Sequence, residues 1–211
     1  MIDAYDWPGG REAMLRFGPA GAPVVMLLLP LFEEHNRTRA FGVSVLRALA
    51  VRGIAGALPE LPGQGESLVP TEALRLDDLR AAAAAAADAL GRPFVATVRS
   101  GALLDTDAAV AGRWRLSPQT GGDLVRELRR LRAQGDGMTV AGNALSEMQL
   151  AELEAADHLD ARIVRLESDP APAVRKIAGP PLWRRAEPGN DFALVQTVTA
   201  DIADWIATCV A

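Results

Sequence analysis

The sequence is poor in the two residue types that most often build disulfides and metal sites. It has one cysteine, Cys209, and two histidines, His35 and His158. A single cysteine cannot form an internal disulfide, and its apolar helical surroundings lead us to expect a buried thiol in a reducing compartment. Isolated histidines and scattered carboxylates lack the spacing of metal ligands, so we expect no metal and no cofactor.

An excess of positive charge and a long hydrophobic run are also missing. The formal net charge is −5, which gives no electrostatic basis for binding nucleic acid or anionic lipid. Asp3 and Asp6 stand where a signal peptide would carry basic residues, and the apolar run 23–32 is too short to span a membrane. We therefore expect a cytoplasmic protein with no membrane insertion. A local group of arginines is interpreted as a solvated helix face: Arg126, Arg129, Arg130 and Arg132.

The sequence does contain a regular alternation of strand and helix patterns. Strands are expected at residues 13–17 (an edge strand), 24–29, 54–58, 94–98, 113–116, 138–141, 163–166 and 182–185. Helices are expected at 36–52, 74–90, 123–133, 146–156 and 197–210, with another beginning at 101. Gly53 suits a helix C-cap and Ser146 an N-cap. This alternation predicts a single α/β domain, 1–211, whose mostly parallel sheet has helices on both faces.

One loop carries the most specific pattern. Residues 58–67 read Leu-Pro-Glu-Leu-Pro-Gly-Gln-Gly-Glu-Ser. They resemble the Asp-x-Pro-Gly-x-Gly-x-Ser turn after the fourth strand of the α/β-hydrolase superfamily, with Glu60 in place of the usual Asp. Residues 30–39, 98–104 and 140–146 are similar to stretches of the hydrolase-like group associated with the exosortase A system. The resemblance implies a compact α/β-hydrolase-like fold without a full cap domain, in a bacterial protein encoded near genes for exopolysaccharide synthesis.

A serine hydrolase of this fold places its nucleophile on a tight strand-to-helix turn with the pattern Gly-x-Ser-x-Gly. Small flanking residues are needed because the backbone is strained and a neighbouring chain lies close. In one register Arg99 stands at the apex, with Gly101 two residues later; in the other Ser100 does, between Val98 and Ala102. We favour the first register because it keeps a glycine. It removes the nucleophile, since a guanidinium stays protonated.

The rest of the catalytic triad is incomplete as well. Asp169, or alternatively Glu167, stands where the resemblance implies the catalytic acid, although an Asp before Pro170 also opens a turn. The histidine of the fold follows the last strand, which places it near residues 186–191, and no histidine occurs after His158. A serine without a base is a poor nucleophile at neutral pH.

Other residues could occupy the same end of the sheet. His35 follows the strand 24–29 and could cap a helix, bind a ligand or reach Ser100; we favour a structural role, and we expect His158 on the surface. Arg99 would point into the pocket and pair with carboxylates from neighbouring loops. The candidate partners, which are also candidate ligand contacts, are Glu33, Glu34, Glu60 and Asp169.

Three functions stay open on the sequence alone. The first is a catalytically silent hydrolase-like protein, a binding or assembly component with a protein partner, linked by resemblance to exopolysaccharide and exosortase systems. The second is a small esterase or thioesterase that uses Ser100, with His35 as a non-standard base and Asp169 as orienting acid. The third is a protein that binds a small anionic ligand through Arg99. Residues 114–137 leave room for one helix, so we expect a shallow pocket; the oligomeric state stays open.

Overall fold

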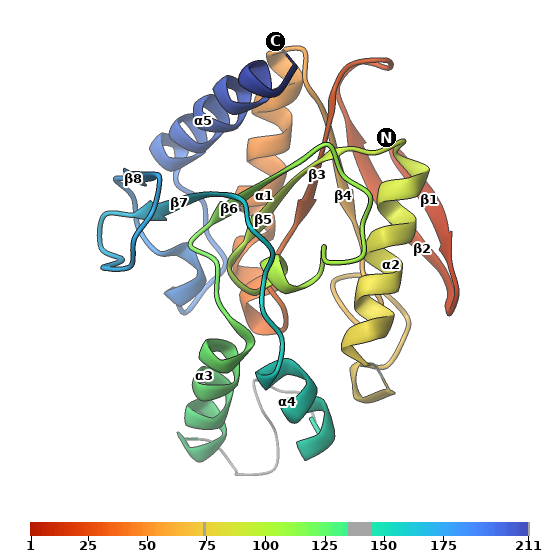
Figure 1. Ribbon diagram of the computed structural model, residues 1–211, viewed down its shortest axis with the longest axis vertical. Coiled ribbons are helices and arrows are strands. Elements are labelled where there is room, and N and C mark those ends of the chain that lie inside the picture. Colours follow the sequence, from red (N-terminus) through yellow and green to blue (C-terminus); the bar gives the residue numbers. More distant parts are fainter. Residues whose placement is uncertain (74, 135–144, 211) are drawn as a thin grey trace.

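The computed structural model describes residues 1–73, 75–134 and 145–210, and its strands form one sheet (Figure 1). The order across the sheet is β1-β2-β4-β3-β5-β6-β7-β8. The β1–β2 and β2–β4 pairs are antiparallel and the other pairs are parallel. This confirms the predicted mostly parallel α/β sheet. In chain order the strands are β1 (Ile2–Trp7), β2 (Gly10–Phe17), β3 (Val24–Leu28), β4 (Ala55–Pro59), β5 (Phe94–Val98), β6 (Gly112–Leu116), β7 (Arg162–Leu166) and β8 (Arg175–Ile177).

Helices cover both faces of this sheet. On one face α1 (Glu33–Val51) and α5 (Phe192–Val210) pack together. On the other face lies α2 (Leu76–Ala89), whose buried alanines let the helix backbone approach the strands closely. By length and composition α5 could cross a membrane, but its apolar residues Val198, Ile202 and Ile206 are buried in the core.

The predicted helix caps lie at their expected places. Gly53 follows α1 with a φ of +78°, the left-handed conformation that glycine adopts without strain, and its N–H donates to Ala50. Ser146 precedes α4 (Glu147–Glu154), and its Oγ accepts a hydrogen bond from the backbone N–H of Gln149.

Several elements differ from the prediction. The strand at 13–17 is not at the edge, because β1 lies outside it. The residues after β5 form a five-residue 3₁₀ turn, η2 (Arg99–Leu103), where a longer helix was expected. Residues 182–185 are no strand: they begin with the 3₁₀ turn η3 (Leu182–Arg184), and the last strand, β8, comes earlier. Cys209 is exposed, because the end of α5 extends past the core. The expected strand at 138–141 lies outside the described residues.

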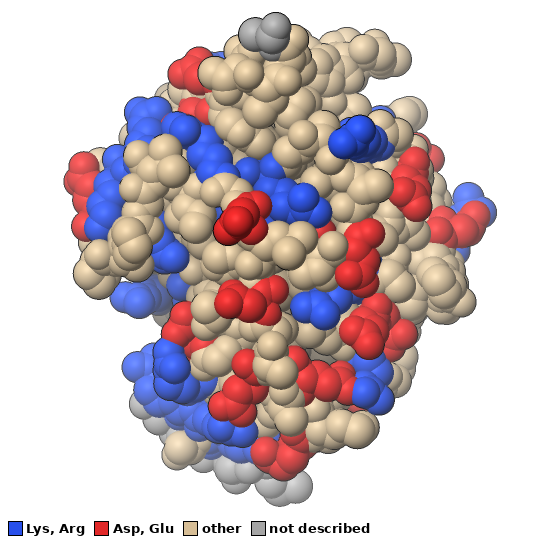
Figure 2. Space-filling model, in the orientation of Figure 1, with Lys and Arg blue, Asp and Glu red and all other residues tan. Residues whose placement is uncertain are grey.

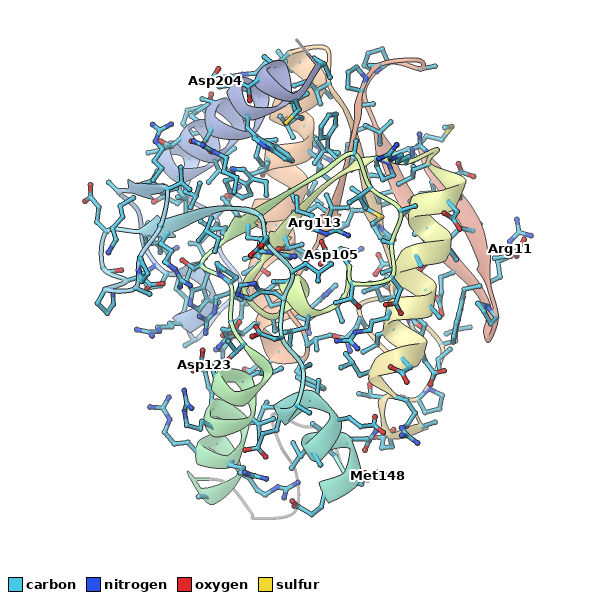
Figure 3. The ribbon with its side chains drawn as sticks, in the orientation of Figure 1. Arg11, Asp105, Arg113, Asp123, Met148 and Asp204 are labelled. Carbon is cyan, nitrogen blue, oxygen red and sulfur yellow. The ribbon has the colours of Figure 1, made fainter. Side chains whose placement is uncertain are left out.

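Buried ion pairs hold the chain between η2 and β6 in place of a helix. Asp105 is fully buried and accepts from Arg115 at 3.0 Å and from Arg113 at 3.1 Å. Figure 3 shows Asp105 and Arg113 side by side near the centre of the molecule. Arg115, itself fully buried on β6, also donates to the backbone oxygen of Ala102 in η2. The network fastens this turn to the sheet, since each buried charge has its partners.

Charges of both signs are spread over the face shown in Figure 2, with basic side chains gathered toward the side that carries β7 and β8. On these two strands, Arg162 of β7 and Arg175 of β8 pair with Asp201 of α5. The arginines of α3 (Gly121–Gln134) are also paired in part: Arg126 with Asp123, Arg129 with Glu154 and Arg132 with Glu147.

Candidate functional site

The turn that follows β5 has the backbone of a nucleophile position, and Arg99 occupies its apex. Arg99 has a φ of +52°, which a side chain with a β-carbon rarely adopts. Gly101 lies so close to β3 that a β-carbon on it would stand 2.4 Å from the backbone oxygen of Leu28. A strained backbone and a close approach to a neighbouring strand are the two features expected of the turn that carries the nucleophile in a hydrolase of this fold, the nucleophile elbow. Ser100 comes one residue after the apex.

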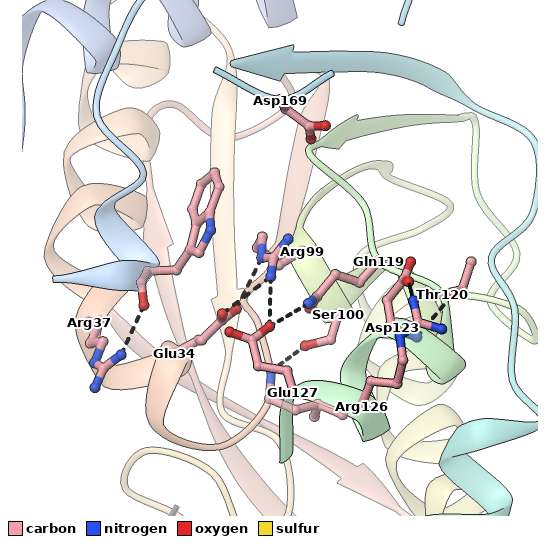
Figure 4. Close-up of polar contacts among 12 residues, drawn as sticks. Glu34, Arg37, Arg99, Ser100, Gln119, Thr120, Asp123, Arg126, Glu127 and Asp169 are labelled. Atoms are coloured by element: carbon pink, nitrogen blue, oxygen red, sulfur yellow. Dashed lines mark hydrogen bonds and ion pairs between the residues drawn. The ribbon is translucent and has the colours of Figure 1, made fainter. Parts of the chain in front are cut away.

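The guanidinium of Arg99 is held by two acids and one aromatic ring. Its Nε lies 3.3 Å from Glu34 on α1, and its Nη2 lies 3.1 Å from Glu127 on α3. The ring of Trp183 in η3 lies 5.1 Å from the guanidinium carbon, within the range of a cation–π contact. Figure 4 shows Glu34 and Glu127 converging on Arg99 from separate elements. We call Arg99, Glu34, Glu127 and Trp183 the Arg99 cluster.

Burial sets the electrostatics of this cluster. Burial raises the pKa of Glu34 above its usual value, Arg99 lowers it, and the nearby carboxylate of Glu127 raises it again. The net direction is upward, so the two acids compete for one cation. Arg99 is therefore fully engaged by charges of the protein itself on its Nε and Nη2 sides.

The other predicted acids lie at the same end of the sheet but pair with different arginines. Glu33 pairs with Arg37 within α1. Glu60, in the loop after β4, pairs with Arg39 of α1, and the backbone oxygen of Glu60 accepts from the hydroxyl of Tyr5. This carboxylate fastens the predicted Pro-Gly-rich turn to α1. Among the predicted acids, Glu34 alone contacts Arg99 in the part of the chain that the structure describes.

Asp169 follows β7, as expected of the acid, but serves that loop locally. Its Oδ2 accepts from Arg165 at 2.7 Å and its Oδ1 from the backbone N–H of Ala171. Burial raises the pKa of Asp169, but these hydrogen bonds outweigh burial and hold it below the usual value. Figure 4 shows the carboxylate apart from the Arg99 cluster. Asp169 therefore stays charged and closes the turn before Pro170.

Ser100 is buried and its hydroxyl oxygen already accepts a hydrogen bond. The donor is the backbone N–H of Leu31, in the loop after β3, at 3.0 Å. The next backbone N–H, that of Phe32, donates to the side-chain oxygen of Gln64 at 3.0 Å. In hydrolases of this fold an N–H of this loop completes the oxyanion hole. Here the side chains of Ser100 and Gln64 occupy both N–H groups.

The two histidines do not supply a base for Ser100. His35 is buried in the first turn of α1, beside Arg39, and burial together with that arginine lowers its pKa to about 4. His158 lies in the loop before β7. Over the described ranges no hydrogen bond joins either histidine to Ser100.

The predicted place of the missing histidine, residues 186–191, lies in the second half of the loop after the last strand. Because β8 is Arg175–Ile177 and α5 begins at Phe192, this loop runs from Ala178 to Asp191. That loop brings Trp183 against Arg99. An indole therefore lies beside the elbow, and an indole N–H can donate but cannot accept a proton.

The segment between β6 and β7 covers this end of the sheet. It contains α3, the one helix expected within residues 114–137, and α4, which corresponds to the helix expected at 146–156, and the two helices pack against each other (Figure 1). Two cavities of about 650 and about 330 Å³ lie beside α3, and Glu127 and Trp183 line both of them. Among the described residues no group of His, Cys, Asp and Glu could hold a metal ion.

Comparison with known proteins identifies the architecture. No known protein family and no curated protein matches the sequence. A thermophilic esterase from Thermogutta terrifontis, solved with malate bound, aligns over 99% of both chains at 14% identity with a TM-score of 0.58. The fold is that of an α/β-hydrolase.

Structures of epoxide hydrolases also align with the chain. A mutant of an epoxide hydrolase from Vigna radiata aligns over 56% of this chain at 21% identity, with a TM-score of 0.46. One from an endophytic Streptomyces aligns over 55% at 28% identity, with a TM-score of 0.43. The chain covers only 38% and 36% of these two proteins, so it spans less than two fifths of their length.

Sequence reasoning missed three contributors to the site. Glu127 lies among the arginines for which the sequence predicts a solvated helix face, Gln64 lies in a predicted turn, and Trp183 lies in a predicted strand. Each reaches the site from an element whose position depends on the whole sheet. The one sequence feature that could have indicated a role in the site is the glutamate Glu127 among four arginines, and this pattern is equally typical of surface ion pairs.

Proposed function

We propose that this α/β-hydrolase-fold protein has no serine-hydrolase activity and acts as a binding or assembly component. The observation that carries the proposal is the position of Arg99 at the strained apex of the elbow, with its guanidinium paired to Glu34 and Glu127. A guanidinium stays protonated in proteins and has no lone pair with which to attack a carbonyl.

The oxyanion site supports the same proposal. Transition-state stabilisation requires N–H groups that are free to bind the developing oxyanion, and losing one such donor costs about 10²–10³-fold in kcat. The N–H groups of Leu31 and Phe32 are already satisfied by Ser100 and Gln64. An incoming carbonyl oxygen would first have to displace these intramolecular hydrogen bonds.

The esterase alternative requires Ser100 to act in place of Arg99. Its hydroxyl would have to leave the N–H of Leu31 and meet a base, and His35 is buried beside Arg39 with its pKa lowered to about 4. Asp169 would have to orient that base, but it pairs with Arg165. The three residues of this alternative thus have other partners.

The assembly role draws on the resemblance of residues 30–39 and 98–104 to the exosortase-associated group. We propose on that basis a cytoplasmic component of exopolysaccharide or surface-protein export that works with a protein partner. Loss of chemistry with retention of the fold is consistent with selection for a surface or a pocket, since function resides in sites placed on folds.

Turnover of p-nitrophenyl acetate, butyrate and octanoate tests the absence of catalysis. We expect the wild-type protein and Ser100→Ala to release p-nitrophenol at the same rate, because Ser100 has no access to a substrate carbonyl. Ser44→Ala, on the outer side of α1, is the matched control for the loss of one serine hydroxyl. A wild-type rate ten or more times that of Ser100→Ala, with Ser44→Ala unaffected, would overturn the proposal.

A further inference from the structure

The smaller cavity lies where the loops after β5, β6 and β7 meet η3. It has a volume of about 330 Å³, at the lower end of the range for small-molecule sites. Its lining combines the charged residues Arg99, Arg165, Asp169 and Arg184 with several prolines and Trp183. Asp123 and Glu127 balance the arginines, so hydrogen-bonding groups, and not net charge, decide what the cavity can hold.

One buried acceptor in this lining has no partner. Gln119 is 4% exposed, and its Nε2 donates to Glu127 at 3.0 Å. This hydrogen bond fixes which end of the amide is the nitrogen, because a carboxylate accepts and cannot donate. The opposite atom, Oε1, is buried and accepts no hydrogen bond from the described residues. Buried carbonyl oxygens are rarely left in this state, and each one calls for an explanation.

Two donors of the same cavity are also unused. Arg99 donates hydrogen bonds from its Nε and Nη2 to Glu34 and Glu127, and within the described ranges no hydrogen bond is found for its Nη1. Arg184 is exposed, lines the cavity and forms no ion pair with the described residues. The guanidinium of Arg99 is held in a fixed orientation by its acids and by Trp183, so its free N–H groups are preorganised.

We propose that this cavity binds a small carboxylate that also carries a hydroxyl group. The carboxylate accepts hydrogen bonds from Arg99 Nη1 and from Arg184, and the hydroxyl donates to Gln119 Oε1, which a small rotation of the buried amide brings to the cavity surface. The carbon skeleton lies against the prolines and Trp183. The proposal rests on the binding role proposed above and specifies the chemical class of the ligand; no bond is made or broken.

Lactate and propionate differ only in one hydroxyl group, the group from which Gln119 is proposed to accept a hydrogen bond. We would titrate each into the ¹⁵N-labelled protein and follow the side-chain amide of Gln119 and the indole of Trp183 by NMR. Lactate is expected to shift both signals saturably and to bind several-fold more tightly than propionate. Equal affinities, or no saturable shift with either acid, would overturn the proposal without using any variant.

Variants then assign the contacts. Gln119→Ala is expected to reduce the affinity for lactate to that for propionate, whereas Arg184→Ala weakens both acids by a similar factor. Gln196→Ala, an exposed glutamine on α5, is the matched control and leaves both unchanged. A lactate preference that survives Gln119→Ala would contradict the assignment. A negative result in these titrations would not bear on the proposed absence of catalysis. That proposal is tested by ester turnover in the wild type and Ser100→Ala, and not by ligand affinity.

Discussion

Arg99 adopts a backbone conformation that costs about 1–2 kcal/mol for a residue with a β-carbon. In a hydrolase such strain positions a nucleophile. Here the same strain presents a guanidinium to Glu34, Glu127 and Trp183, and the charge-assisted contacts offset its cost. The strained turn is therefore maintained by the Arg99 cluster and requires no chemical role.

His35 gives a prediction at the same scale. Burial and Arg39 lower its pKa to about 4 from an ordinary value of 6.5, so between these pH values the unfolded chain binds a proton that the folded protein does not. The contribution to stability is complete above pH 6.5 and is lost as pH falls through 4. It amounts to about 3 kcal/mol. We expect the free energy of unfolding in urea to fall more steeply from pH 7 to pH 4 in the wild type than in His35→Gln.

His158→Gln provides the comparison, since His158 lies in a loop and not in the core. It should keep the wild-type pH dependence. If His35→Gln and the wild type lost stability in parallel across this range, the buried neutral state of His35 would be wrong.

The site could be predicted in part from single residues. Arg99 and Glu34 follow from their places after predicted strands, because the ends of parallel strands meet at one edge of the sheet. Glu127, Gln64 and Trp183 could not be assigned, because their contacts depend on how a helix, a loop and a 3₁₀ turn pack onto that edge. The hydrogen bond from Leu31 to Ser100 also needs the register of β3 against β5.

At the scale of elements, Asp201 links α5 to three strands. Its carboxylate accepts from Trp114 of β6 at 2.7 Å, from Arg162 of β7 at 2.9 Å and from Arg175 of β8 at 2.8 Å. Burial raises its pKa, but these donors outweigh burial and lower the pKa to about 2. One carboxylate thus holds the helix to the end of the sheet.

Asp201→Asn is expected to lower the free energy of unfolding by about 2–3 kcal/mol, because two arginines lose their charged partner. This loss of stability is expected because the Asp201 carboxylate is buried and paired, and not merely because α5 loses one negative charge. Urea denaturation at pH 7 measures the difference.

Asp204→Asn is the control on the same helix. Asp204 is exposed (Figure 3), and its substitution should change stability by less than about 0.5 kcal/mol. Equal losses for Asp201→Asn and Asp204→Asn would show that the link between α5 and the strands contributes nothing specific.

Central elements could be predicted better than peripheral ones, for a physical reason. The strand β5 is apolar on both faces because helices cover both, and such runs are distinctive. The strand β8 is three residues long with two of them basic and exposed, so its sequence resembles a loop. The turn η2 lacks the helix that its apolar residues suggest, because buried ion pairs at Asp105 fasten the chain instead.

At the scale of the whole molecule, the chain has an α/β-hydrolase fold with Arg99 at the apex of the turn after β5. The helices α3 and α4 cover the carboxyl ends of the strands and contribute Glu127 to the Arg99 cluster. Two cavities lie against α3, so the fold still offers space for a ligand. We propose that this space contains no activated nucleophile.

Intact-mass spectrometry after incubation with a fluorophosphonate probe tests that claim most directly. A serine hydrolase of known activity in the same tube shows that the probe is competent, and Ser100→Ala identifies any labelled position. We predict that the protein keeps its mass while the reference hydrolase gains one probe. A stoichiometric adduct on the wild type that disappears in Ser100→Ala would show that Ser100 is an activated nucleophile and would contradict the account.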